Sequence, residues 1–178
     1  MISLQIEKIK KICLATILSA MMLLISHDAL ARSRMAKAEV HSVKGVPCFT
    51  ISEKEERRNG QPYLGALIVS DLTDKPVSEV WGFLMTGGKK VLLTSKSCLL
   101  YGNLPSGASG LPAPALKTGH VYEVFLNGRP KDGSDPTYGY AGKFCVADSM
   151  NGMQKIIPVT REMQEWIDET CPVSSPSK

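Results

Sequence analysis

Residues 121–147 read VYEVFLNGRPKDGSDPTYGYAGKFCVA, and this stretch predicts a β-hairpin at the centre of the fold. Its second run places four aromatic or apolar side chains on one parity, Tyr138, Tyr140, Phe144 and Val146. Because side chains alternate between the two faces of a strand, this parity predicts one buried, aromatic face. Residues 128–136 are rich in Gly, Pro, Asp and Ser, which favour turns. We therefore expect a central hairpin that carries Cys145 into the core.

Shorter apolar runs on both sides of the hairpin predict further strands. They fall in residues 36–43, 46–51, 63–69, 80–85, 89–94 and 154–159. Near the end of the chain, Met163, Trp166 and Ile167 share one helical face behind Thr160, a candidate N-cap, and we expect this face to pack on the core. Many short strands and one helix predict a mainly β fold. Its expected form is an antiparallel β-sandwich, immunoglobulin-like, with a short C-terminal helix.

The first 31 residues have the order of a secretory signal peptide. Three lysines, Lys8, Lys10 and Lys11, precede an apolar run over residues 12–25, and small residues end at Ala31. The run is shorter than the roughly 20 residues that span a bilayer, so cleavage after Ala31 is favoured over a retained anchor. We expect residues 32–172 to form a single disulfide-stabilised β domain, followed by a disordered tail at residues 173–178.

Four cysteines remain after the expected cleavage: Cys48, Cys98, Cys145 and Cys171. An even number in an exported chain predicts two disulfides, because oxidising compartments preserve such bonds. Four cysteines allow three pairings, and their order in the sequence does not choose among them. We prefer Cys48 with Cys98 and Cys145 with Cys171. The spacing of a redox-active or zinc-binding cysteine pair is missing from the sequence.

Charge and histidine spacing argue against several function classes. The formal net charge is +4, and no basic block is longer than a pair, so the sequence does not favour nucleic-acid binding. His41 and His120 are isolated in sequence, without the spacing of a metal site. We therefore expect no enzyme, no cofactor and no metal. A secreted hydrolase would require His41 or His120 to meet a serine and a carboxylate after folding.

Two loops are candidates for binding a partner. Residues 102–114 are rich in Gly, Pro, Ser and Ala without periodicity, and long loops of this kind are commonly functional. The tip of the central hairpin, Lys131 to Asp135, is the second candidate. Tyrosines on a strand either pack or anchor a partner, and we expect at least one of Tyr138 and Tyr140 to pack. The predicted partner-binding side chains are Ser106, Ser109, Lys131, Asp132, Asp135 and Tyr138.

Several short motifs resemble a known family by their order and spacing. They are VPCFTI at residues 46–51, Cys98 followed by Tyr101-Gly102, KTGHVY at residues 117–122, Phe144-Cys145 and the late Cys171. Together they resemble the immunity periplasmic lipoproteins associated with type VI secretion in Gram-negative bacteria. The likeness spans residues 40–171.

The resemblance implies a small all-β periplasmic protein that binds a cognate secreted toxin effector. Such effectors attack membrane lipid or cell-wall peptidoglycan, and the immunity protein works by occlusion. The export signal ends in Ala31-Arg32 without a lipid-acceptor cysteine, which departs from the family and favours a soluble form with no stable membrane insertion. The alternative function is a periplasmic envelope-binding or assembly module with no toxin partner.

Overall fold

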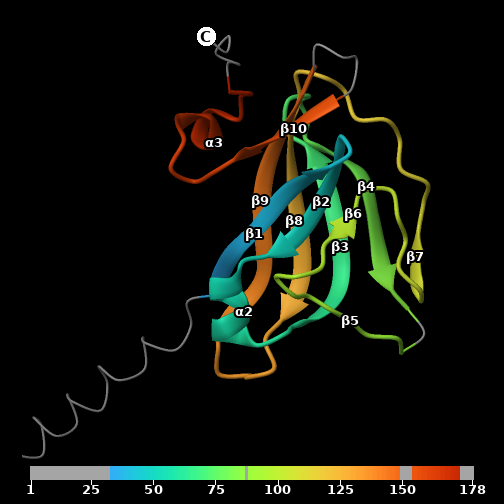
Figure 1. Cartoon of the computed structure of the whole chain (residues 1–178), viewed down its shortest axis with the longest axis vertical. Coiled ribbons are helices and arrows are strands. Elements are labelled where there is room, and N and C mark those ends of the chain that lie inside the picture. The colour runs from blue at the N-terminus through green and yellow to red at the C-terminus, as the bar shows by residue number, and fades with distance from the viewer. Residues whose placement is uncertain (1–32, 87, 149–153, 173–178) are drawn as a thin grey trace, which may run out of the picture. The chain divides into compact units, whose positions relative to one another are not determined.

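The computed structural model describes residues 33–86, 88–148 and 154–172, and its strands join in one curled sheet (Figure 1). The strands are β1 (Arg34–Val43), β2 (Val46–Ile51), β3 (Tyr63–Asp71), β4 (Ser78–Met85), β5 (Val91–Leu92), β6 (Leu99–Leu100), β7 (Ala108–Gly110), β8 (Val121–Arg129), β9 (Thr137–Asp148) and β10 (Gln154–Val159). Two short helices are described, α2 (Glu53–Asn59) and α3 (Gln164–Asp168). The expected signal peptide, residues 1–31, and the expected tail, residues 173–178, lie outside the described residues.

The order of strands is β6-β2-β1-β9-β8-β3-β4-β7, with β10 also paired to β9 and β5 to β3. The predicted mainly β class is confirmed, whereas the antiparallel sandwich is not: the sheet is a mixed half-barrel. Residues 34–37 of β1 pair in parallel with β9, and residues 38–43 of the same strand pair antiparallel with β2. Because β1 pairs with both β9 and β2, the strands β2 and β6 extend the same sheet and do not form the second layer of a sandwich.

The predicted central hairpin is confirmed, since β8 and β9 pair antiparallel from Val121 opposite Cys145 to Leu126 opposite Tyr140. Its inward side chains are fully buried. The ring of Phe144 stacks on Tyr122 at 5.4 Å and lies 5.7 Å from Phe49 of β2. Burial of one such side chain stabilises the fold by about 1.5–3 kcal/mol, so this aromatic cluster is a major part of the core.

The prediction that Tyr138 lies on the buried face of its strand is wrong, because the side chain is exposed. The register of β1 against β9 shifts between Thr137 and Gly139, and this bulge leaves Tyr138 out of step with the buried Tyr140. The ring of Tyr138 lies 6.4 Å from Phe125, which alternates with the core residues of β8 and therefore lies on the outer face. A Cβ atom at Gly139 would clash with the ring of Phe125, so glycine suits this position.

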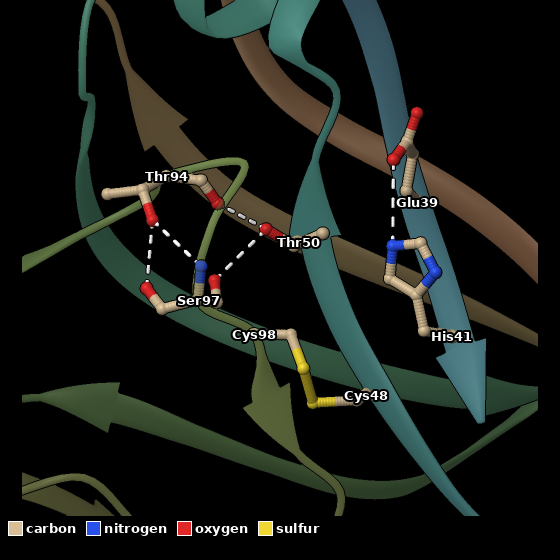
Figure 2. Close-up of a disulfide and its surroundings, with 7 residues drawn as sticks. All are labelled: Glu39, His41, Cys48, Thr50, Thr94, Ser97 and Cys98. Atoms are coloured by element: carbon tan, nitrogen blue, oxygen red, sulfur yellow. Dashed lines mark hydrogen bonds and ion pairs between the residues drawn. A yellow bond between two sulfur atoms is a disulfide. The ribbon is translucent and has the colours of Figure 1, made fainter. Parts of the chain in front are cut away.

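The four cysteines form two disulfides, Cys48–Cys98 and Cys145–Cys171, in the pairing preferred from the sequence. Figure 2 shows the first of them beside Thr50, whose buried hydroxyl lies within hydrogen-bond reach of the main-chain carbonyls of Thr94 and Ser97. The second attaches the chain after α3 to β9. Each bridge is of a kind that typically stabilises a fold by about 2–4 kcal/mol.

The C-terminal helix is shorter than predicted, and its apolar face does not pack on the core. It begins behind Met163 rather than Thr160, buries none of its residues, and leaves Ile167 71% exposed. Polar contacts hold it instead, since Lys143 Nζ donates to the Trp166 carbonyl at 3.0 Å and to Glu169 Oε1 at 3.1 Å. Neither described helix is long and apolar enough to cross a membrane.

Candidate partner-binding surface

Both loops predicted to bind a partner reach the same end of the sheet. In Figure 1 the hairpin turn is the orange connection at the bottom, beyond β8 and β9. Loop 102–114 approaches this end through Lys89, whose Nζ donates to Ser106 Oγ at 2.8 Å. The next residue, Lys90, lies over the ring of Tyr63, and Tyr63 pairs with Arg129 at the end of β8. The two loops are therefore connected through Lys89, Lys90 and Tyr63.

Tyr63 contacts several neighbouring segments at this end of the sheet. It begins β3, pairs with Arg129 on one side and Leu92 on the other, and keeps 41% of its surface exposed. Lys90 Nζ lies 4.5 Å from the centre of its ring and Lys131 Nζ lies 5.9 Å from it. A cation–π contact at an exposed site contributes about 0.5–1 kcal/mol, enough to bias both lysines toward the ring.

Across Arg129 from Tyr63, a hollow of about 260 Å³ follows the hairpin turn and ends at Tyr138, which is 43% exposed. We name the whole set the tip surface, made of Tyr63, Lys90, Arg129, Lys131 and Tyr138. It combines exposed aromatic rings with positive charge. Interface centres are enriched in aromatic and arginine side chains and depleted in lysine, so Tyr63, Tyr138 and Arg129 are the members of this set that suit an interface centre.

The two aspartates of the hairpin turn shape the turn itself. Asp132 Oδ1 accepts hydrogen bonds from the Ser134 hydroxyl at 2.7 Å and the Ser134 amide at 2.9 Å, and these bonds lower the pKa of Asp132. Burial acts to raise the pKa of Asp135, but hydrogen bonds from Thr137 and Arg58 outweigh it and lower that pKa. Both carboxylates therefore remain ionised and hold the turn in one shape.

Ser109 lies in a neighbouring groove. It pairs with Leu84 across β7 and β4 and lines a hollow of about 450 Å³ with Leu84 and Leu111, both exposed. Of the six predicted binding residues, Lys131 and Tyr138 belong to the tip surface, and Asp132 and Asp135 lie in the adjoining hairpin turn. Ser106 and Ser109 lie on loop 102–114, outside the tip surface. Three residues of the tip surface were not predicted from the sequence: Tyr63, Lys90 and Arg129. Only the Lys89-Lys90 pair after a glycine turn could have suggested that charge collects here.

The tip surface is positive. Its Lys90, Arg129 and Lys131 are exposed, as is the adjoining Lys89, and none of the four forms an ion pair with another residue in the described part of the chain. Arg58 is different, because Asp135 accepts from its Nε at 3.1 Å. The surface therefore presents an excess of positive charge, which the exposed carboxylate of Asp132 offsets only in part.

His120 belongs to a separate cluster at the opposite end of β3. Its Nδ1 lies 2.9 Å from Oδ2 of the buried Asp71, and one ligand atom each from Asp71, Asp74 and His120 lie within 4.8 Å of one another. Lys117 Nζ also donates to Asp74 at 2.6 Å, so an ammonium group already neutralises one carboxylate there. Within residues 33–86, 88–148 and 154–172, no serine hydroxyl hydrogen-bonds to His120.

His41 is solvent-exposed on β1, with its Nε2 3.6 Å from Glu39 (Figure 2). Neither histidine therefore has both the serine and the carboxylate that the predicted hydrolase alternative requires among the described residues. The tip surface remains the strongest candidate site on its own chemistry. Comparisons with family models, curated proteins and solved structures find no match to this chain.

Proposed function

We propose that this protein binds a secreted toxic effector of type VI secretion through its tip surface and neutralises it by occlusion. The observation that carries the proposal is the exposure of Tyr63 and Tyr138, 41% and 43%, at the end where both candidate loops meet. Tyrosine supplies a large contact area with few rotatable bonds, so its ordering on binding costs little.

Hydrogen bonds connect the base of the tip to α2, which suits an inhibitor. Asn59 of α2 donates to the buried Tyr140 hydroxyl at 2.9 Å, and Arg34 joins Glu55 of α2 to Thr137 at the start of β9. These contacts fix α2 against the hairpin before any partner arrives. A preformed surface loses less conformational entropy on binding, and more of the contact energy then appears as affinity.

The size of a stable interface sets the footprint. A specific complex buries about 800 Å² on each partner. One large aromatic side chain buries about 150–250 Å², so Tyr63 and Tyr138 cannot supply that area alone. We therefore extend the proposed footprint along Lys89 and Ser106 onto loop 102–114.

The sulfur chemistry supports the proposed compartment. Two disulfides in a chain of this size favour export, because the cytoplasm keeps most thiols reduced. We place the protein in the periplasm of a Gram-negative bacterium, soluble after signal cleavage. The resemblance of its motifs to immunity proteins suggests a membrane-lipid or cell-wall hydrolase as the effector.

Co-expression tests the proposal. The full chain is produced together with the product of a toxin-candidate gene beside its own, with the toxin directed to the periplasm, and growth is measured. The wild type should restore growth, and the Tyr63→Ala/Tyr138→Ala variant should not. Ile167→Ala is the matched control, because it removes an exposed apolar side chain from α3, away from the tip.

Failure of the folded wild-type protein to restore growth would contradict the proposal. Co-sedimentation with wall or membrane fractions, together with no effect on the toxin, would favour the envelope-binding alternative.

A further inference from the structure

Two lysines of the tip lie near one aromatic ring, and an arginine lies on the neighbouring strand. Lys90 and Lys131 reach the ring of Tyr63 from the segment before β5 and from the hairpin turn, two parts of the chain that are distant in sequence. Arg129 pairs with Tyr63 from the neighbouring strand. Gathering like charges costs free energy unless an opposite charge approaches, even when solvent screens them.

Nearby carboxylates provide that opposite charge only in part. Asp132 accepts two hydrogen bonds from Ser134, and Asp135 accepts from Arg58 and Thr137. Each carboxylate is thus held by groups of the turn or of α2. Because Asp135 pairs with Arg58, the ionised Asp132 is the carboxylate of the turn that offsets Lys90, Arg129 and Lys131, and a net positive charge remains available to a ligand.

We infer that the effector presents an acidic surface, a cluster of Asp or Glu side chains, to the tip surface. This inference rests on the proposed function. The ammonium groups of Lys90 and Lys131 donate to carboxylates of the partner, while the ring of Tyr63 between them packs against its chain. Charge-assisted hydrogen bonds of this kind are about twice as strong as neutral ones, and they fix orientation as well as adding affinity.

Complementary charge of this kind mainly changes the association rate. Complementary charge raises association rates by about 10–10³-fold, and the effect falls as salt screens it over about 10 Å at 0.1 M. An inhibitor that must capture a toxin before it acts benefits from this rate. Association should therefore be faster at low ionic strength than at high ionic strength.

Charge reversal with a matched control tests the inference. Lys90→Glu/Lys131→Glu reverses charge at the tip, and Lys44→Glu/Lys155→Glu makes the same change in net charge at the far end of the sheet, where both lysines are exposed. Association with the purified neighbouring toxin is followed by surface plasmon resonance at low and high salt. Thermal unfolding verifies that both variants are folded.

The tip variant should associate at least about tenfold more slowly at low salt and lose most of the salt dependence, while the control stays within about twofold of wild type. Equal slowing in both variants would overturn the inference, because net charge alone would explain it. Wild-type binding that the tip variant retains in full would overturn the inference and leave the proposed function standing. No binding by the wild type would overturn both.

Discussion

The surroundings of the Cys48–Cys98 disulfide differ from the tip surface in how their side chains are buried and how their polar groups are paired. Around the disulfide, Cys48 and Thr50 are buried, and the Thr50 hydroxyl lies within reach of two main-chain carbonyls (Figure 2). At the tip, aromatic rings are exposed and positive charges have no ion-pair partner among the described residues. The contrast suggests that one region maintains the fold and the other contacts a partner. Substitutions in the buried region should therefore lower stability, and substitutions at the tip should weaken binding with little change in stability.

The largest expected effect is the loss of a core ring. Phe144→Ala should lower the free energy of unfolding by about 3–5 kcal/mol, because it opens a cavity between Phe49 and Tyr122. Tyr138→Ala, on the exposed side of the same strand, should change it by about 0.5 kcal/mol or less. Urea denaturation measures both values. Equal costs for the two substitutions would remove the distinction between the buried and exposed faces of β9.

The two disulfides should differ in how much they stabilise the fold. Replacing Cys48 and Cys98 together by alanine should cost about 2–4 kcal/mol. The bridges close loops with sequence separations of 50 and 26 residues. In the loop-entropy description, the longer loop means that Cys48–Cys98 contributes about 0.6 kcal/mol more to the free energy of unfolding than Cys145–Cys171 does.

Denaturant unfolding of the two double-alanine proteins measures that difference. A greater cost for removing Cys145–Cys171 would mean that the attachment of α3 stabilises the fold more than loop length predicts. It would also move part of the stabilising role to the C-terminal segment.

The smallest expected effect concerns acid stability. Hydrogen bonds from the Ser95 hydroxyl and amide lower the pKa of Glu56 to about 2, below its ordinary value of 4.5. Because the folded-state pKa is the lower one, this contribution is present above pH 4.5 and is lost as pH falls toward 2. Glu56 is solvent-accessible, so screening keeps the contribution to about 1 kcal/mol or less.

Glu56→Gln should therefore weaken the protein at neutral pH and converge with wild type near pH 2 in acid titrations of unfolding. A constant difference between the two proteins across this range would show that Glu56 contributes through packing rather than through its charge.

Local patterns predicted much of this molecule because they act over short distances. The alternation of β8 and β9 and the turn residues between them define a hairpin without reference to the rest of the chain. Pairing of β1 with both β9 and β2 was not predictable, since alternation assigns side chains to faces and does not choose neighbouring strands. The bulge at Tyr138 places Gly139 against the ring of Phe125 on the neighbouring strand, a contact that the local pattern does not specify.

The candidate site was predictable in part for the same reason. Loop composition located the hairpin tip and loop 102–114, because turn residues signal loops directly. The gathering of Lys90 and Lys131 around Tyr63 depends on the pairing of β3 with β5 and β8, strands far apart in the sequence. A count of charges along the chain could not reveal it.

The affinity of the purified full chain for the effector, measured by isothermal titration calorimetry, tests the central claim most directly. The Tyr63→Ala/Tyr138→Ala variant should bind at least about a hundredfold more weakly than wild type, because anchor residues of an interface each contribute about 2 kcal/mol or more. Its unfolding curve should match that of wild type. Unchanged affinity in this folded variant would contradict the account.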